Sequence, residues 1–332
     1  MAGYLGRRMI YMVVLLLLLS FVSFLIIQLP PGDYLTTMIA RMRSRGLVID
    51  PTLIEHYERR YGLSLPIFQQ YMVWFGNLLR GDLGESFIYN EPVLDLIKQR
   101  ILLSSAITFG TLIVTYAIAV PIGIYSATHQ YSFTDYVFTV LGFIGLAVPN
   151  FLLALILMFL AFRYFGWNVG GLFSREYVVA PWSWGKFLDL LKHLPIPLFV
   201  IGTAGTASLI RILRGSLLDE LRKQYVTTAR AKGVPERRLL YKYPVRVAIN
   251  PIVSHIGYLL PTLVAGETLT SIVLSLPTVG PLLLEALQQQ DMYLAGSLLM
   301  VLGVLALIGV LLSDILLVIV DPRIRFEARE PA

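Results

Sequence analysis

The side chains that most often perform catalysis are few in this chain and lie far apart in the sequence. Its four histidines stand at positions 56, 129, 193 and 255, without the spacing of a metal site. The chain has no cysteine, which excludes disulfides, cysteine-ligated metals and thiol catalysis. It also has no Walker A, GxGxxG, HExxH or GxSxG motif. The sequence therefore predicts no catalytic residue, no metal site and no cofactor bound by this chain itself.

An ionisable residue or a proline inside an apolar stretch is the other pattern that could carry chemistry here. Glu267 and His255 lie in one long apolar stretch, and Pro149 interrupts another. A charge in the middle of a bilayer costs on the order of 3 kcal/mol, so such residues usually face a cavity or a partner. These three residues are candidates for lining a translocation pathway. Two alternatives remain open: Glu267 could lie in water near the outer interface, and His255 could be a packing residue.

The segment Tyr225–Arg246 has the clearest pattern for contact with another protein. It is basic and rich in small residues, and it lies between long apolar runs. Apolar residues at helical spacing lead into it, and a run of small residues is expected to continue the same helix. The apolar set is Leu217, Leu218, Leu221 and Tyr225; the small set is Thr227, Thr228, Ala229 and Ala231.

The residues after this run predict a tight bend and a second helix. Gly233, which follows Lys232, suits the left-handed residue after a helix C-terminus. Pro235 suits the first turn of a helix over Pro235–Leu240, with Glu236 near its positive end. A hairpin of Ala, Thr, Lys and Arg has little to pack inside itself, so we interpret it as a docking surface. The alternative is a basic loop that follows the positive-inside rule.

The composition indicates a membrane protein. Hydrophobic residues make up 56% of the chain and charged residues 14%, whereas a soluble protein has about 25% charged residues. A bilayer core needs roughly 20 apolar helical residues. The first apolar run ends without a cleavage site, and we expect it to be a retained span. The six expected spans are Met9–Leu29, Ile101–Thr128, Tyr136–Phe162, Leu194–Ile210, Val247–Ser275 and Met292–Val320.

The distribution of basic residues predicts the orientation. With the N-terminus inside, the inner segments hold most of the Lys and Arg of the short loops, as the positive-inside rule requires. These are Arg7, Arg8, the basic residues between Arg214 and Arg246, and Arg323, Arg325 and Arg329. Both termini are therefore expected on the cytoplasmic side, and the net charge of +6 reflects topology and not nucleic-acid binding.

Residues 30–100 form the longest segment between expected spans, too long for a plain connector. Helices are expected over Thr52–Tyr61, Pro66–Leu79 and Pro92–Gln99, with a turn at Gly81–Gly84. The last of these helices would lead into the second span. The segment is either a compact external cap or a landing surface for an external partner.

The hairpin residues resemble the EAA loop of permease subunits in binding-protein-dependent ABC importers. In that family the loop forms a coupling helix that enters a groove on the ATPase subunit. The small-residue motif falls on Thr227-Thr228-Ala229 and the glycine on Gly233. This sequence has Thr where the family has Glu, and Val245-Arg246 where Leu-Pro usually follows. The sequence from Thr228 to Gly233 looks like the dipeptide/oligopeptide branch.

The resemblance extends over nearly the whole chain. The matching stretches are Leu29-Pro30-Pro31-Gly32-Asp33, Tyr61-Gly62-Leu63, Gly81–Ser86, Pro121–Ile124, Pro149-Asn150-Phe151 and Asp321–Arg325. One departure lies at Ser271–Gly280, where the branch often has Glu-Thr, an aromatic residue and Pro-Gly. The resemblance implies oligopeptides or dipeptides as the solute, and this departure keeps oligosaccharides as an alternative.

The family implies an all-α integral membrane protein with six transmembrane helices of the type I ABC importer permease kind. It implies ATPase coupling through Thr227, Thr228, Ala229, Ala231, Lys232, Gly233 and Pro235. The expected divisions are 1–29 (N-terminus and span 1), 30–100 (external helical domain), 101–320 (five-span core with coupling segment 214–246) and 321–332 (cytoplasmic tail).

The resemblance also implies partners and a location. The partners would be a second homologous permease, two cytoplasmic ATPase subunits that bind ATP and Mg²⁺, an external solute-binding protein and membrane lipid. The location would be a prokaryotic cell membrane. Two rival interpretations are an ion-coupled secondary transporter and a membrane enzyme. The chain shows no clear internal repeat, few intramembrane charges and no clustered histidines, which are the features those rivals need.

Overall fold

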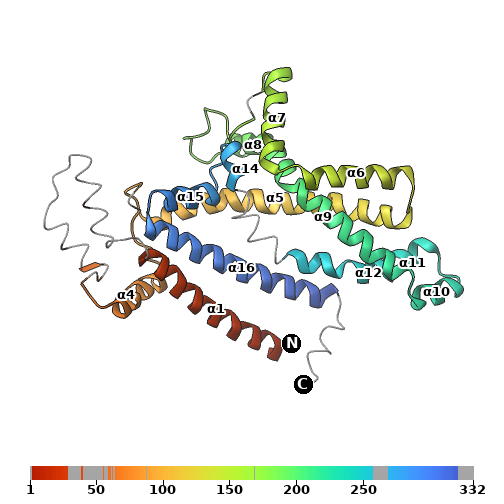
Figure 1. The fold of residues 1–332 in the computed structure, drawn as a ribbon, viewed down its shortest axis with the longest axis horizontal. Helices are drawn as coiled ribbons and strands as arrows, with labels where there is room; N and C mark the ends of the chain where they lie inside the picture. The colour runs from red at the N-terminus through yellow and green to blue at the C-terminus, as the bar shows by residue number, and fades with distance from the viewer. Residues whose placement is uncertain are drawn as a thin grey trace. The chain divides into compact units, whose positions relative to one another are not determined.

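The protein is described by a computed structural model that covers residues 2–28, 39, 55, 59–60, 62, 64–86, 88–167, 169–256 and 268–320. Within those residues the chain is helical, with one isolated bridge between Glu85 and Pro92 (Figure 1). In chain order the helices are α1 (Ala2–Gln28), α4 (Ile67–Leu79), α5 (Val93–Thr128), α6 (Phe133–Ala147), α7 (Asn150–Phe165), α8 (Trp184–His193), α9 (Pro195–Leu221), α10 (Gln224–Ala231), α11 (Glu236–Lys242), α12 (Pro244–Ala248), α14 (Thr268–Val273), α15 (Val279–Gln288) and α16 (Met292–Val320). Residues 250–256 are also helical.

The chain divides into two compact units. The larger contains Leu103–Gly280 and Ala306–Ala332, and the smaller contains Ala2–Leu102 and Pro281–Leu305. The helices α5 and α16 contribute residues to both units. The domain divisions expected from the sequence, at residues 30, 101 and 321, remain an expectation.

Four of the described helices are long and apolar enough to cross a membrane, namely α1, α5, α9 and α16. The pair α6 and α7 gives a fifth span if its two bent parts are counted together. The expected fifth span, Val247–Ser275, includes residues 257–267, which lie outside the described part of the chain. The expected helix Thr52–Tyr61 also falls largely outside it, although Glu55, Arg59 and Arg60 are helical.

The third expected span, Tyr136–Phe162, is not one straight helix. The helices α6 and α7 meet at an angle of 102°. Val148 ends α6 in an extended conformation and Pro149 precedes α7. A proline clashes with the helical conformation of the preceding residue and has no N–H to donate, so the helix breaks at this point. The proline that interrupts the apolar stretch therefore marks a change of direction in the structure.

Two other helices are longer in the structure than the sequence predicted. The helix α5 runs without interruption over 36 residues from Val93, so the expected separate helix Pro92–Gln99 is its beginning. The helix α9 continues past Ile210 to Leu221. It does so because Leu209, Leu213 and Leu217, spaced four residues apart, keep one apolar face buried beyond the charged Arg211.

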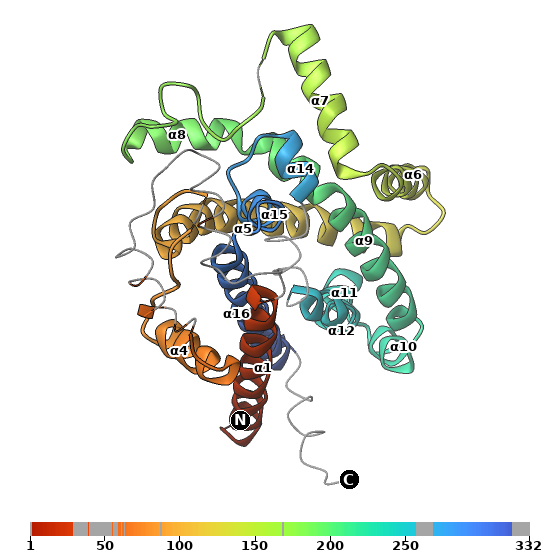
Figure 2. The ribbon, with the colours of Figure 1, turned by 60° about the vertical axis from the view of Figure 1, so that its left-hand side comes forward.

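The core of the larger unit is built around α9, which contacts α6, α7, α8 and α12. The three buried leucines of α9 pack with Ala119 and Ile124 of α5 and with a second group from the segment after α11. That second group is Val245, Ala248 and Ile252. Burying a leucine side chain contributes roughly 1.5–3 kcal/mol. Figure 2 shows α9 crossing α5 and passing beside α12.

Glycine permits the closest approach in this packing. A Cβ atom added to Gly145 of α6 would lie 2.9 Å from the Cγ2 atom of Thr203 in α9. That distance is shorter than a normal contact, so α6 and α9 can lie this close only because the position has no side chain. The small residue Thr203 of α9 therefore serves ordinary helix packing at this point.

In the smaller unit α1 packs on α4. Phe24 of α1 is buried against the rings of Tyr71 and Trp74, with centroid separations of 5.4 and 5.8 Å. The hydroxyls of Ser20 and Tyr71 are 2.8 Å apart. The expected helix Pro66–Leu79 is thus present as α4, with Pro66 immediately before its first residue.

A buried carboxylate fixes the segment that precedes α5. Asp291, at the start of α16, is fully buried and accepts hydrogen bonds from the Ser86 hydroxyl (2.5 Å) and the Ile88 N–H (3.1 Å). The Tyr89 hydroxyl donates to Glu285 at 2.7 Å. Burial and this hydrogen bond raise the pKa of Tyr89 to about 12, so the hydroxyl stays a donor. The segment is therefore held to α15 and α16 at two points.

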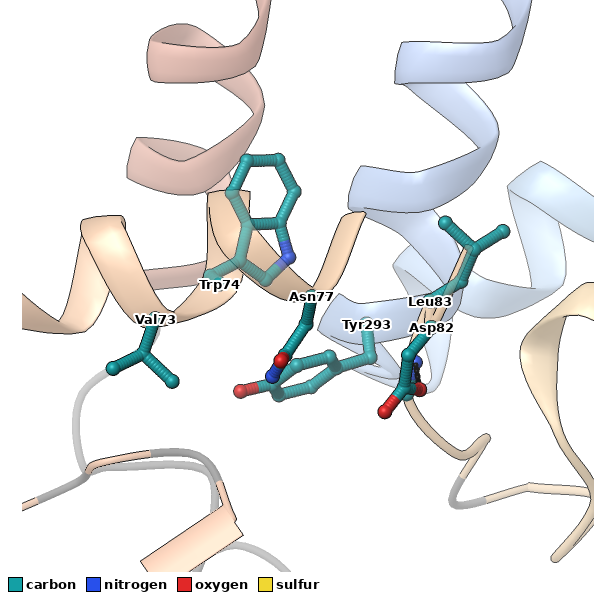
Figure 3. A pocket seen from close by; sticks show the side chains of 7 residues that line it. Val73, Trp74, Asn77, Asp82, Leu83 and Tyr293 are labelled. Carbon is teal, nitrogen blue, oxygen red and sulfur yellow. Dashed lines mark hydrogen bonds between the residues drawn. The ribbon is translucent and has the colours of Figure 1, made fainter. Parts of the chain in front are cut away.

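The expected turn at Gly81–Gly84 is confirmed, and Figure 3 shows its surroundings. Both glycines have left-handed backbone conformations, with φ of +81° and +83°. A small pocket lies beside the turn, with the ring of Tyr293 close to Gly84. Its lining is Val73, Trp74, Asn77, Asp82, Leu83, Gly84 and Tyr293.

We predict that Gly84→Ala destabilises the chain more than Gly81→Ala. Because both glycines have positive φ, each alanine carries a similar backbone cost of about 1 kcal/mol. Only at Gly84 does the new Cβ meet a side chain, at 2.7 Å from Cδ1 of Tyr293, whereas nothing lies within 4 Å at Gly81. The overpacking adds about 1–3 kcal/mol. Thermal unfolding of the purified chain in detergent measures the difference.

Replacing the ring in the Gly84→Ala background provides the control. A Tyr293→Leu substitution should remove the overlap and recover part of the lost stability. Equal unfolding temperatures for the two alanine variants would contradict the packing described here.

Candidate functional site

The segment expected to dock another protein is a hairpin of two short helices, α10 and α11. Gly233 has φ of +75°, and its N–H donates to the Arg230 carbonyl at 3.0 Å. The Val234 N–H then donates to the Ala229 carbonyl at 3.3 Å. These bonds close the C-terminus of α10, so the predicted left-handed glycine is confirmed. Pro235 precedes α11 directly, and Glu236 lies in its first turn, as expected.

The helix that leads into the hairpin ends earlier than the sequence predicted. The helix α9 stops at Leu221, Lys223 is extended, and α10 begins at Gln224. The expectation of one helix from Leu217 through Ala231 was therefore wrong. Neither Pro nor Gly marks this break. It is a tertiary effect, because a new helix direction lets Val226 and Ala229 face α11.

The hairpin also has a core of its own, contrary to the expectation that it had little to pack. Val226 and Leu239 are fully buried, and Ala229 is 8% exposed. Val234 and Tyr243 pack against these three residues. The hairpin is thus a small packed unit and not an extended basic loop.

An ion pair crosses the bend of the hairpin. The Arg230 Nε atom donates to Glu236 at 2.5 Å, and this hydrogen bond holds the pKa of the Glu236 carboxyl below its usual value. Both side chains are exposed, so solvent screens the pair and it adds little stability. Its effect is that the two charged side chains beside the bend are paired with each other.

The predicted site residues fall on two sides of this unit. Ala229 is buried in its core, whereas six others are exposed. The exposed set is Thr227, Thr228, Ala231, Lys232, Gly233 and Pro235. No atom lies within 4 Å of a Cβ built on Gly233, apart from its immediate neighbours in the chain. The bend therefore presents small side chains and an open backbone at the tip of the hairpin, a shape that fits into a groove.

Both ends of the hairpin continue into helices that pack on each other. The helix α10 follows α9, α11 leads to α12, and α12 packs on α9. The Tyr116 hydroxyl of α5 donates to the Ile252 carbonyl at 2.6 Å, which adds a hydrogen bond to this packing. These contacts connect both ends of the hairpin to one packed group of helices.

An ion pair that was not predicted from the sequence joins α6 to α9. Arg214 donates from Nε and Nη2 to the two carboxylate oxygens of Asp135, at 3.0 and 2.9 Å. Asp135 is buried, and it also accepts from the Tyr131 N–H at 3.1 Å. Ser132 caps α6 by accepting from the Asp135 N–H. The pairing spans 79 residues of sequence, so only the local Ser-x-x-Asp cap could have been found beforehand.

The candidate pathway residues are separate from the hairpin in sequence and lie on other elements. Pro149 is at the bend between α6 and α7. His255 is partly buried in the helical residues 250–256. Glu267 lies outside the described residues. Among the described residues, no three His, Asp or Glu side chains form a group that could hold a metal ion.

Known proteins resemble this chain along its full length. Residues 119–326 match the family described as binding-protein-dependent transport system inner membrane component. Residues 1–108 match the N-terminal part of the membrane component of binding-protein-dependent transport systems.

Individual relatives cover nearly the same length. The oligopeptide transport system permease protein AppB of Bacillus subtilis is 34% identical over 98% of this chain and 100% of its own length. The peptidoglycan transport system permease protein YejB of Agrobacterium fabrum is 30% identical over 99% of this chain and 100% of its own length. The dipeptide transport system permease protein DppB of Alkalihalophilus pseudofirmus is 28% identical over 98% of this chain and 100% of its own length.

We predict that Asp135→Ala lowers stability by about 3 kcal/mol, because it leaves the Arg214 guanidinium without its carboxylate in a partly buried site. The double variant Asp135→Leu/Arg214→Met should recover most of the loss, since it replaces the pair with apolar groups. Ser132→Ala is the matched control, which removes only the cap bond at about 1 kcal/mol. Thermal unfolding in detergent reports all three. A double variant as unstable as Asp135→Ala would show that the charges do not act as a pair.

Proposed function

This chain belongs to the family of binding-protein-dependent transport system inner membrane components, and on that premise we propose that it forms half of the translocation pathway of an ATP-driven peptide importer. The observation that carries the proposal is the hairpin α10–α11. It is a packed unit with a small, open tip, joined at both ends to helices that pack on each other. That is the structure required of an element that receives force from a separate subunit.

The energy for transport would enter through this hairpin. The chain has no phosphate-binding loop, so ATP and Mg²⁺ would be held by two cytoplasmic ATPase subunits. The exposed residues Thr227, Thr228 and Lys232 and the bend at Gly233 would sit in a groove of one such subunit. Closure of the ATPase pair on ATP would displace the hairpin.

The buried contacts of α9 would carry that displacement into the membrane. Leu209, Leu213 and Leu217 connect α9 to α5 and to residues 244–252. The Asp135–Arg214 pair makes α6 follow α9. Because packed helices shift as rigid bodies and do not deform smoothly, these contacts would switch the spans between outward-open and inward-open arrangements.

The remaining partners follow from the family description. An external solute-binding protein would deliver the solute, and a second homologous permease would supply the other half of the pathway. The chain would lie in a prokaryotic cell membrane with both termini cytoplasmic and six spans in all. Pro149, His255 and Glu267 remain the candidates for residues along the pathway.

Peptides are the proposed solute because relatives that cover this chain over its full length are named for oligopeptides and dipeptides. The departure at Ser271–Gly280 keeps oligosaccharides as the alternative to be tested. Specificity in such a system would be set largely by the external binding protein, which this chain does not contain.

We predict that Gly233→Trp removes ATP-coupled uptake while the chain still folds. A side chain at this φ costs about 1–2 kcal/mol, and no atom other than those of the chain neighbours lies within 4 Å of a Cβ built at this position. A bulky residue would instead clash with the ATPase groove, and an overpacking cost of about 1–3 kcal/mol corresponds to a loss of coupling of roughly 5- to 150-fold. Uptake and ATP hydrolysis in proteoliposomes of the complete complex measure the effect.

Gly233→Asn is the matched variant, because asparagine tolerates a left-handed conformation and is small. It should retain most of the uptake at normal abundance. Normal coupled transport by the tryptophan variant would exclude the tip of the hairpin from the ATPase contact.

We predict that uptake by the complete complex requires ATP and its external binding protein, and persists after ion gradients are dissipated. Mass spectrometry of ligands that co-purify with the binding protein should identify peptides. If only oligosaccharides co-purified, the chain would still be part of an importer, but its solute would be an oligosaccharide and not a peptide. Gradient-driven uptake without the ATPase subunits would instead indicate a secondary transporter.

A further inference from the structure

The helix α8 (Trp184–His193) has its polarity reversed relative to a helix on the surface of a soluble protein. Two charged side chains, Lys186 and Asp189, are buried with Leu190. The exposed face carries large apolar side chains at helical spacing. These are Trp184, Phe187, Leu188 and Leu191, with exposed fractions of 73%, 39%, 43% and 47%.

The buried face of α8 is fixed by specific bonds, so the helix cannot turn its apolar face inward. Asp189 accepts from both the N–H and the hydroxyl of Ser174 at 2.7 Å. Although burial opposes ionisation, these bonds hold the pKa of Asp189 below its usual value. Lys186 donates from Nζ to the Ala180 carbonyl at 2.6 Å and lies 4.9 Å above the ring of Phe173.

The position of α8 along the chain places it at the edge of the membrane. Leu194 ends α8 and immediately precedes α9, which is one of the helices able to span a bilayer. The start of α9 is therefore the level at which the chain meets the lipid surface. The two helices also contact each other, so α8 stays near that level.

Other exposed aromatic residues lie at the C-terminal end of α7 and between α7 and α8. Aromatic residues, and tryptophan in particular, concentrate where hydrocarbon meets water in membrane proteins. The exposed residues here are Phe162, Tyr164, Phe165, Trp167 and Trp182. The helix α7, to which the first three belong, contacts α9 as well.

We propose that the apolar face of α8 is embedded in the boundary between headgroups and acyl chains, with phospholipid as its occupant. An amphipathic helix binds there by burying its apolar face a short distance into the bilayer. Lys192, which is exposed near the C-terminus of α8, would remain at the headgroup level. The assignment of this boundary to the outer leaflet rests on the proposed function and topology, whereas the embedding itself does not.

Single-cysteine labelling tests the proposal in the assembled complex, because the natural chain has no cysteine to remove. Leu188→Cys places a thiol on the apolar face, and Lys192→Cys places one at the exposed position of a charged residue near the C-terminus of the same helix. In intact cells, a charged maleimide that does not cross membranes should react with Lys192→Cys. It should react with Leu188→Cys at least an order of magnitude more slowly. Equal rates would show that the face lies in water and would overturn the proposal.

Tryptophan quenching separates lipid from a protein occupant. The chain has four tryptophans, at positions 74, 167, 182 and 184. In nanodiscs, phosphatidylcholine brominated near the headgroup should quench most of the emission of Trp184, more than a lipid brominated near the chain end. The signal of Trp184 is obtained from a variant whose other tryptophans are Phe, or as the difference between the natural chain and Trp184→Phe. Trp74, which is buried against aromatic side chains, is the control.

Emission of Trp184 that is unaffected by either brominated lipid would overturn the proposal. Labelling of Lys192→Cys only from the cytoplasmic side, together with quenching of Trp184, would support the embedding and reject the proposed topology. The failure of the embedding of α8 is thus distinguished from the failure of the proposed function and topology.

Discussion

The buried row of leucines on α9 is the interaction on which the larger unit depends. Leu209, Leu213 and Leu217 are fully buried and hold α5, α9 and the segment 244–252 in one apolar cluster. Glycine at position 145 allows α6 to approach the same helix, and the Asp135–Arg214 pair adds a polar connection. Contacts from several neighbouring helices therefore converge on one continuous helix.

The hairpin extends this arrangement beyond the end of α9. Its small core of Val226, Ala229 and Leu239 makes it a rigid element, whereas its tip is open and has small side chains. A rigid body with an open tip suits a contact that must carry force without deforming. The paired charges of Arg230 and Glu236 lie beside the tip, where solvent reaches them.

Four charged side chains of α6, α8 and α9 follow one pattern. Asp135 and Arg214 bond each other, Asp189 bonds Ser174, and Lys186 bonds the Ala180 carbonyl. Each charge is satisfied inside the protein, so large apolar side chains can occupy the outside of the same helices. This inversion is favourable only where the surroundings are apolar, because lipid cannot form hydrogen bonds with an exposed charge.

Much of the structure could be predicted from the sequence, wherever a local constraint decides it. Gly233 is left-handed because the C-terminus of α10 needs a residue without a Cβ at that point. Pro149 breaks a helix because it lacks an N–H and constrains Val148. Helical membrane structure followed from long apolar runs, since a bilayer requires backbone hydrogen bonds within the segment.

Tertiary structure alone decided the rest, because the deciding contacts join residues distant in sequence. Pro149 marks where α6 ends, but it does not give the angle of 102° between α6 and α7, and no Pro or Gly marks the end of α9 at Leu221. The pairing of Asp135 with Arg214 joins residues from two different helices. The hairpin core forms only when α10 and α11 fold together. Likewise, the bonds of Asp189 and Lys186 determine which face of α8 lies outside.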